Sequence, residues 1–396
     1  MKRSVRDDEA RGGINMEKTP VRILYVNGGL MHRNGTEAFM MNYYRRFDRS
    51  LLQIDFVVHG EGKGEYDEEI ISLGGKIYHV PVKSKHPFAY PRALKKIFSR
   101  GYRVVHTHTD AMGCWILKVA KACGVPVRVA HSHNTGHLTN NPLKIRLNEY
   151  ARKNIVKYAT HCFACSEAAG KWLFGDHPFT VVRNAIDLEK FAFRPSAREE
   201  VRAELGLSPS DFAVGHVGRF APQKNHGFLL EVFRAFASKE PRAKLLLVGD
   251  GELRTEIRDK AAAYGIADRI LFLGVRTDTD RLYSAMDAFV LPSLFEGLPV
   301  VALEAQANGL PCLLSESVSR EAGIAEAGVR FLPFDVEEWT HALKQTENAR
   351  RTDNTEALRR AGYDIASESG KLQDFYLHMA AKTAEEENGR KQKQCD

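Results

Sequence analysis

The sequence predicts an α/β protein made of two doubly wound, parallel-sheet domains, and three observations support this fold class. The chain has 396 residues, more than one hydrophobic core usually supports, so two domains are expected. From residue 20 onward, short apolar runs alternate with helix-like stretches, which is the pattern of a parallel sheet covered by helices. The same rhythm restarts in the second half without a short repeat period, which favours two similar domains over a solenoid.

Six apolar runs are the expected strands of the first domain. Near-continuous runs of Val, Ile and Leu are typical of strands that are buried on both faces. Amphipathic stretches separate these runs, and one of them, MGCWILKVAKACG, ends at a capping Gly124. The expected strands are 21–26, 53–59, 76–82, 102–108, 125–133 and 160–166.

The second domain is expected to hold five further strands and to begin near 183–196. The last amphipathic stretch, GYDIASESGKLQDFYLHM, reads as a helix, and the polar residues after it read as a frayed tail. The strands are expected at 212–220, 243–251, 269–275, 288–293 and 310–317. The expected organisation is a disordered leader 1–19, a first domain 20–183 joined by the C-terminal helix 363–381, a second domain 184–362, and a disordered tail 382–396.

Composition and charge exclude several classes of protein. No apolar run approaches the ~20 residues that span a bilayer, and the charged N-terminus has no apolar signal region. Residues 20–175 hold 23 Lys and Arg against 11 Asp and Glu, whereas the whole chain has a net charge of +7. This basic half suggests an anionic partner; a membrane surface or a diphosphate-linked acceptor fits better than nucleic acid, for which no motif is present. We expect a cytoplasmic protein, with peripheral contact to the inner membrane face as an open alternative.

Cysteine and histidine patterns raise the question of a metal site. Six cysteines without an export signal make a disulfide framework unexpected, and Cys162 with Cys165 would face opposite sides of a strand, as core residues do. His106 and His108 end one expected strand, and His131 and His133 end another. We expect His106 and His131 to be buried structural residues, His108 and His133 to be the cleft candidates, and no metal or cofactor to be bound. The other four cysteines are Cys114, Cys123, Cys312 and Cys395.

Two loops that follow expected strands carry glycine and charge. NGGLMHRNGTE (27–37) contains Gly35 and Thr36 where a helix starts, so its backbone N–H groups suit a phosphate. GHVGRFAPQKNHG (215–227) places Gly218, Arg219 and Lys224 at another helix entrance, where two cations would clamp a diphosphate. Each pattern alone also fits an ordinary strand-to-helix turn.

The most specific pattern is PSLFEGLPVVALEAQANGLP (292–311). Glu296 and Glu304 have seven residues between them, and Gly297 and Pro299 mark the turn into a helix. Glu304 is expected about two turns into that helix, on the order of 10 Å along its axis. This separation does not suit the carboxylate pair of a retaining glycosidase, which needs ~5 Å. It suits two acceptors that hold different hydroxyls of one long ligand.

Residues 142–158 (PLKIRLNEYARKNIVKY) combine five cations and one acid with apolar residues at helical spacing. Such a helix could lie on an anionic membrane or meet a lipid-linked acceptor. An ordinary amphipathic helix packed on the sheet would have a similar sequence.

The Glu-x7-Glu element, the GRFxxxK turn, the LLLVGDGE strand end and HSHN together resemble family-4 glycosyltransferases, in their exopolysaccharide and capsule (EpsF-like) branch. The resemblance runs from about residue 20 to about residue 380. It implies the GT-B fold, in which two Rossmann-like domains face a cleft, with the acceptor on the first domain and the donor on the second. It also implies retaining transfer of a hexosyl group from a nucleoside diphosphate sugar, with UDP favoured, to a glycan or polyprenyl-diphosphate-linked saccharide.

The resemblance assigns roles to individual residues. Glu296 would contact the donor sugar and Glu304 the ribose, while Arg219 and Lys224 would hold the diphosphate. His108 would lie near the reacting sugar. The implied donor-binding set is Gly35, Thr36, His133, Gly218, Arg219, Lys224, Glu296, Gly297, Leu298, Pro299 and Glu304, and the implied catalytic set is His108, Arg219, Lys224 and Glu296.

Two other functions stay open on the sequence. A sugar-nucleotide epimerase on the same scaffold would consume donor without acceptor, and the Glu-x7-Glu pattern argues against it. A non-catalytic nucleotide-sugar-binding protein would not need Arg219, Lys224, Glu296 and Glu304 all intact.

Overall fold

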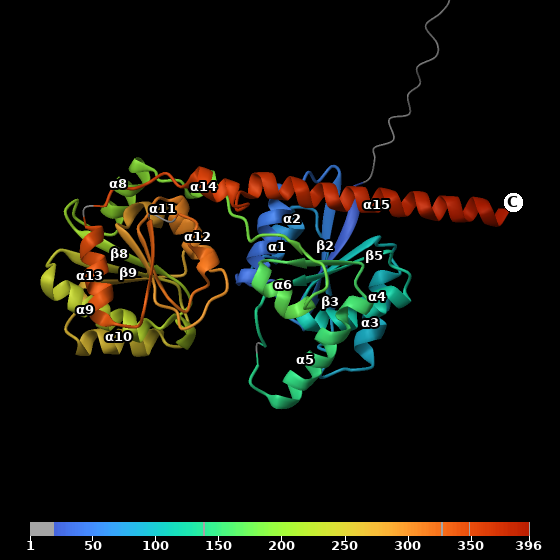
Figure 1. Ribbon diagram of the computed structural model, residues 1–396, viewed down its shortest axis with the longest axis horizontal. Coiled ribbons are helices and arrows are strands. Elements are labelled where there is room, and N and C mark those ends of the chain that lie inside the picture. The colour runs from blue at the N-terminus through green and yellow to red at the C-terminus, as the bar shows by residue number, and fades with distance from the viewer. Residues whose placement is uncertain (1–19, 138, 326–327, 348, 396) are drawn as a thin grey trace, which may run out of the picture.

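The computed structural model describes residues 20–395 apart from 138, 326–327 and 348, so the expected leader 1–19 lies outside the described residues. The chain forms two α/β domains that lie side by side (Figure 1). The first contains a seven-stranded sheet of order β3-β2-β1-β4-β5-β6-β7, and the second a six-stranded sheet of order β10-β9-β8-β11-β12-β13. All of the paired strands run parallel. The predicted fold class is therefore confirmed.

The first domain contains one strand more than the six expected. This additional strand, β7, has only two residues and lies at the sheet edge, too short to produce an apolar run. The elements are β1 (Val21–Asn27), α1 (Gly35–Arg46), β2 (Leu52–His59), α2 (Asp67–Ser72), β3 (Ile77–Val80), α3 (Ala89–Phe98), β4 (Val104–His108), η1 (Asp110–Met112), α4 (Gly113–Ala122), β5 (Val127–Ser132), α5 (Pro142–Asn154), η2 (Ile155–Lys157), β6 (His161–Ala164), α6 (Glu167–Phe174) and β7 (Thr180–Val181).

The second domain also contains an unexpected edge strand, β13, in which a charged Arg330 interrupts the apolar pattern. The elements are α7 (Leu188–Phe191), α8 (Pro195–Glu204), β8 (Phe212–Val217), η3 (Pro222–Lys224), α9 (His226–Lys239), β9 (Ala243–Val248), α10 (Arg254–Ala263), η4 (Ala267–Arg269), β10 (Ile270–Gly274), α11 (Thr279–Ala285), β11 (Ala288–Leu291), α12 (Val300–Ala307), β12 (Cys312–Ser315), η5 (Arg320–Ala322), β13 (Val329–Leu332), α13 (Val336–Thr346) and α14 (Thr355–Arg360).

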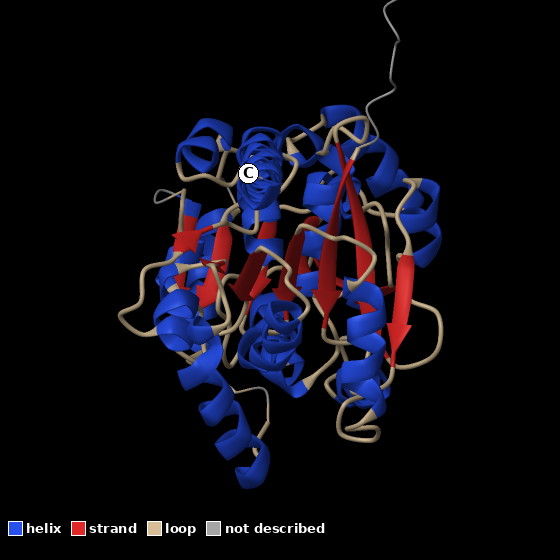
Figure 2. Ribbon diagram, turned by 90° about the vertical axis from the view of Figure 1, so that its right-hand side faces the viewer, coloured by secondary structure: helices blue, strands red, loops and turns tan. Residues whose placement is uncertain are grey.

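Helices cover both faces of the first sheet (Figure 2). Successive residues of β1 point to opposite faces, so Leu24 packs in one core cluster with α3 and α4, while Tyr25 packs in another with α1 and the C-terminal helix. Because both faces are buried, the strands are mainly apolar, which is why the sequence shows them as nearly continuous runs. The thiols of Cys162 and Cys165 are free and lie in the same core cluster as Leu24.

Two chain segments join the domains, and they are bonded to each other. The Ile186 N–H donates to the Tyr363 carbonyl at 2.9 Å, and the Ile365 N–H donates to the Ile186 carbonyl at 2.9 Å. After this crossing, α15 (Ile365–Cys395) lies along the first domain (Figure 1). The hydroxyls of Tyr376 and Tyr25 are 2.9 Å apart in the buried contact between α15 and β1.

The C-terminal helix differs from the sequence expectation of a disordered tail from residue 382. In the structure α15 continues without a break to Cys395. Residues 382–395 contain no proline, and Ala, Glu, Lys and Gln have high helix propensity, so nothing in them ends the helix. Thr383 is buried, and Arg103 pairs with Glu387 at 2.9 Å.

Candidate active site

The functional side chains gather in the loops that follow strand carboxyl ends, where doubly wound sheets bind their ligands. In the first domain these loops follow β1, β4 and β5, and in the second they follow β8 and β11. Among the described residues, no hydrogen bond or ion pair joins the candidate residues of one domain to those of the other. The candidate site therefore consists of two halves, one on each domain.

In the part of the candidate site that lies on the second domain, Lys224 and Glu296 form a central ion pair. Both side chains are largely buried, with 17% and 12% exposure. Their loops are also bonded to each other, since the Gln223 side chain donates to the Phe295 carbonyl at 2.9 Å and the Leu294 N–H donates to the Gln223 carbonyl at 2.8 Å. The cation and the carboxylate are thus held in place by backbone as well as by charge.

Arg219 has a different environment from Lys224. Its side chain is 69% exposed and pairs at 3.1 Å with Glu252, which is 51% exposed. Exposed ion pairs contribute little free energy, so this guanidinium can leave Glu252 for a ligand at low cost. Of the two cations expected to form a clamp, the structure places Lys224 in a fixed contact and Arg219 at the surface.

The LLLVGDGE loop supports the loop that carries Gly218 and Arg219. Gly249 has φ +133°, and a Cβ there would lie 2.1 Å from the Gly218 carbonyl oxygen. Gly251 has φ +157°, and a Cβ there would lie 2.5 Å from the Phe220 carbonyl oxygen. These two glycines are required by backbone conformation and close packing.

Glu304 lies one turn into α12, because the helix begins only at Val300. The expected position of about two turns was therefore too deep. The Tyr283 hydroxyl donates to the half-buried Glu304 carboxylate at 2.9 Å, and burial raises the pKa of Glu304 to about 7. Ahead of the helix, a Cβ on Gly297 would meet nothing within 4 Å among the described residues, so no packing requires a glycine there.

The loop after β1 leads into α1 at Gly35. The preceding Asn34 makes no side-chain capping bond, so the first N–H groups of the helix have no side-chain cap from that residue. A Cβ on Gly35 would also meet nothing within 4 Å among the described residues. An open helix N-terminus of this kind is suited to an anion.

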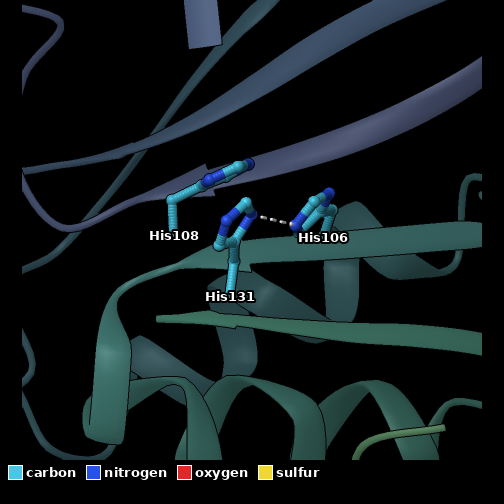
Figure 3. Close-up of side chains that lie close together, drawn as sticks. All are labelled: His106, His108 and His131. Atoms are coloured by element: carbon cyan, nitrogen blue, oxygen red, sulfur yellow. Dashed lines mark hydrogen bonds between the residues drawn. The ribbon is translucent and has the colours of Figure 1, made fainter. Parts of the chain in front are cut away.

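Four histidines from β4 and β5 form one cluster. The rings of His106 and His108 stack at 4.2 Å, and so do those of His131 and His133. His106 Nε2 lies 3.0 Å from His131 Nδ1, and His108 Nδ1 lies 2.9 Å from His133 Nε2 (Figure 3 shows the first of these bonds). In the sequence these histidines form two separate pairs. They come together because β4 and β5 are neighbouring strands of the sheet.

Burial lowers the pKa of all four imidazoles, that of His133 to about 3, so the cluster is neutral at physiological pH. His106, His108 and His131 offer nitrogens within 4.8 Å of one another. Both ring nitrogens of His106 already have hydrogen-bond partners, however, namely the Tyr376 hydroxyl at 2.5 Å and His131 Nδ1 at 3.0 Å. The arrangement suits a hydrogen-bonded relay better than a metal, and the absence of a metal stays a prediction.

His108 is only 3% exposed, but it lines an open cavity of about 660 Å³ in the first domain. His108 Nε2 has no hydrogen-bond partner within the described part of the chain. His133 is half-buried and contacts the cavity only through His108, whereas Asn134 lines it directly. Apolar and polar side chains line the cavity; they include Asn27, Thr36, Glu37, Lys83, Tyr90, Met112, Ile116 and Leu147.

Asp110 is a site residue that the sequence analysis missed. It has φ +45°, a conformation uncommon outside glycine. Its carboxylate accepts from the His133 N–H at 2.7 Å, the Asn134 N–H at 3.3 Å and the Asn134 side chain at 2.8 Å. Asp110 therefore fixes the HSHN loop and, through His133, the ring of His108. The sequence did contain one signal for Asp110, since this acidic residue lies two positions after His108, at the end of a strand where ligands bind.

Replacing Asp110 with alanine is expected to lower the free energy of unfolding by about 1–3 kcal/mol, because buried donors lose their acceptor. We also expect a lower kcat, since His133 no longer holds the His108 ring. Asp110→Asn keeps an acceptor oxygen and a side chain that tolerates positive φ. Its free energy of unfolding and its kcat should therefore fall less than those of Asp110→Ala. Urea unfolding and steady-state rates measure the two effects. Wild-type values in Asp110→Ala would show that the loop holds itself in place.

Comparisons with known proteins show the family to which the chain belongs. The family model described as Glycosyltransferase Family 4 matches residues 33–190, and the model described as Glycosyl transferases group 1 matches residues 197–364. The chain is 37% identical over 375 residues to EpsF of Bacillus subtilis, whose assignment as a glycosyltransferase is itself provisional, covering 91% of this chain and 97% of EpsF. It is 29% identical over 296 residues to the UDP-Gal:alpha-D-GlcNAc-diphosphoundecaprenol alpha-1,3-galactosyltransferase of Escherichia coli, covering 70% and 76% of the two chains.

Solved structures share the fold. HepE of Anabaena, solved with UDP, has a TM-score of 0.74 and 17% identity over 90% of this chain and 99% of its own. HepE solved with UDP-glucose has a TM-score of 0.69 and 19% identity over the same shares of the two chains. The fold and the two-part site define a glycosyltransferase of the GT-B type. The chain belongs to the family-4 glycosyltransferases, and it is a hexosyltransferase.

Proposed function

We propose that the enzyme transfers a hexosyl group, with retention at the anomeric carbon, from a UDP-sugar to a lipid-linked saccharide during exopolysaccharide or capsule synthesis. The observation that supports this proposal is the Lys224–Glu296 ion pair, in which a cation suited to a diphosphate lies against a carboxylate that could accept sugar hydroxyls, beside the entrance of α12. UDP is favoured because HepE was solved with UDP and UDP-glucose and the Escherichia coli relative is named for UDP-Gal. The second domain would bind the donor and the first domain the acceptor.

In this proposal each charged group has one task. Lys224 and Arg219 stabilise the negative charge that develops on the leaving diphosphate. Glu296, with the backbone after it at Gly297, Leu298 and Pro299, orients the donor sugar. Glu304 accepts hydrogen bonds from the ribose, and the α1 N-terminus at Gly35 and Thr36 faces phosphate.

The reaction proceeds on one face of the sugar. The bond from the anomeric carbon to the diphosphate oxygen breaks, the acceptor oxygen bonds to that carbon, and the acceptor proton passes to the departing phosphate. No additional base is required by this balance. His108, neutral and with a free Nε2 at the cavity, is placed to hydrogen-bond a sugar hydroxyl.

A panel of nucleotide sugars tests the proposal, each incubated with and without an undecaprenyl-diphosphate-linked saccharide while nucleotide release and product are followed. We expect UDP release that depends on acceptor, and a product with the donor's anomeric configuration. Donor conversion without acceptor would indicate an epimerase. Binding without any turnover would indicate a non-catalytic protein.

We further propose that the first domain contacts an anionic membrane through α5. Leu143, Leu147 and Tyr150 of this helix are 77%, 45% and 57% exposed, and Lys144 and Arg146 lie exposed beside them. The helix lies at the end of the domain opposite α15 (Figure 1). No described helix is long and apolar enough to cross a bilayer, so the contact would be an interfacial one.

Replacing Leu143 and Lys144 together with serine should weaken binding to vesicles that contain phosphatidylglycerol by about tenfold or more, because buried apolar area and basic charge act together. Transfer to a short, water-soluble acceptor should stay unchanged. Co-sedimentation with anionic and with purely zwitterionic vesicles makes the comparison. Equal sedimentation of wild type and variant would exclude α5 as the contact.

Treatment with EDTA is expected to leave the transfer rate essentially unchanged, since cationic side chains supply the charge at the diphosphate. The same assay, with and without added Mg²⁺ or Mn²⁺, measures this. A large loss restored by either ion would contradict the assignment of Lys224 and Arg219.

A further inference from the structure

Lys83 lines the cavity of the first domain without a carboxylate partner. It lies three residues beyond β3, and no described carboxylate is within 4.0 Å of its ammonium group. Its Nζ is instead 3.7 Å from the ring centroid of Trp115 in α4. A cation over an indole face gains electrostatic attraction, but it keeps a full charge in a half-buried position.

The surroundings hold this ammonium in place but do not neutralise it. Tyr150 of α5 stacks on Trp115 at 5.8 Å between ring centroids, so the aromatic platform is itself supported. Burial lowers the pKa of Lys83 to about 8, so most of the lysine is still charged at neutral pH. A half-buried ammonium group without a carboxylate partner favours an anion.

The rest of the cavity indicates what the anion would be attached to. His108, Thr36 and Asn134 line the cavity with polar groups, while Val82, Ile116 and Leu147 line it with apolar ones. The two carboxylates in the lining, Glu37 and Asp110, already accept hydrogen bonds from Asn27 and from the His133 N–H. A ligand that used all of these groups would carry a sugar, an apolar part and a negative charge beside Lys83.

We propose that Lys83, held over the ring of Trp115, forms an anion subsite of the acceptor cavity, which receives a phosphate or carboxylate group of the acceptor. This inference rests on the proposed function, because it takes the cavity as the acceptor site. The two sources of the anion are the phosphate of a lipid diphosphate and the carboxylate of an acidic sugar. In either case Lys83 selects acceptors by charge and does not take part in the transfer step.

Binding is tested on the full-length protein with UDP present in excess, so that the donor half is occupied. Two anionic probes are used, farnesyl diphosphate and methyl glucuronide, each beside its neutral counterpart, farnesol and methyl glucoside. Calorimetry measures affinity and tryptophan emission reports the Lys83–Trp115 contact. We expect at least one anion to bind about tenfold or more tightly than its neutral counterpart. The preferred probe identifies the source.

Lys83→Met should abolish this preference while leaving affinity for UDP unchanged. Lys85→Met is the matched control, because Lys85 is an exposed lysine two residues away in the same loop. Tryptophan emission of the unliganded wild type should titrate near pH 8, and neither Lys83→Met nor Trp115→Phe should show that titration. The emission change separates a charge contact from a folding defect.

The proposal is overturned if neither anion is preferred over its neutral counterpart, including the case in which neither binds, or if the preference survives Lys83→Met. Failure of the proposed function gives a different result, namely no UDP release from any nucleotide sugar. In that case, tryptophan emission during titration with the anionic and neutral probes would still show whether Lys83 selects ligands by charge. Transfer activity that shows no charge preference would refute this subsite alone.

Discussion

Lys224→Ala is expected to lower kcat by about 10²–10³-fold, the effect of removing one preorganised donor to a developing oxyanion. The ammonium lies in a largely buried ion pair with Glu296, so it needs little reorganisation when charge grows on the diphosphate. Affinity for UDP should fall much less than turnover. Single-turnover rates and UDP titrations measure the two quantities separately.

Removing Lys224 also leaves the Glu296 carboxylate without its cation, and a second variant separates this effect. If the loss comes only from the orphaned carboxylate, Lys224→Ala combined with Glu296→Gln should recover activity toward that of Glu296→Gln alone. We expect no such recovery. Lys239→Ala, an exposed lysine at the far end of α9, is the control for loss of charge. Near wild-type turnover in Lys224→Ala would show that this loop is ordinary surface.

Glu304→Gln and Glu296→Gln should fail in different ways. If Glu304 holds the ribose, its variant binds both UDP and the complete donor about ten- to hundredfold more weakly, as expected for a lost charged hydrogen bond of roughly 1.5–3 kcal/mol. If Glu296 holds the sugar, its variant binds UDP normally but loses donor affinity, transfer, or both. Calorimetric titration of each folded variant with UDP and with UDP-glucose gives the result. Normal binding of both ligands by both variants would make the two glutamates surface residues.

The pH dependence of donor binding provides an independent test of Glu304. Burial raises the pKa of its carboxyl to about 7, so the group is mostly protonated near pH 6 and mostly ionised near pH 8. The ionised form accepts the stronger hydrogen bonds, so affinity for UDP-glucose should rise across this range. UDP-glucose is the proper probe because its diphosphate has no group that titrates there. The rise should be absent in Glu304→Gln, and an unchanged rise would assign the titration to another group.

Local patterns in the sequence predicted most of the fold. The strands buried on both faces are continuous apolar runs, and the glycine-bearing loops after them mark the ends where ligands bind. The edge strand β7 was missed because two residues are too few to form an apolar run, and β13 was missed because Arg330 interrupts its apolar pattern. The helical tail was missed because its polar composition is compatible with either a helix or a frayed end.

The sequence by itself also determined the chemical types at the site: the two glutamates of the α12 segment, the cations of the β8 loop, and the paired histidines. Tertiary structure decided which of these groups meet. Lys224 and Glu296 are 72 positions apart, and they touch because β8 and β11 are neighbours in the sheet. The histidine pairs form one cluster because β4 lies beside β5. The Lys83 ammonium lies over the Trp115 ring because the loop after β3 contacts α4. Strand order and burial are long-range properties, set by packing between distant segments, so no local pattern in the chain contains them.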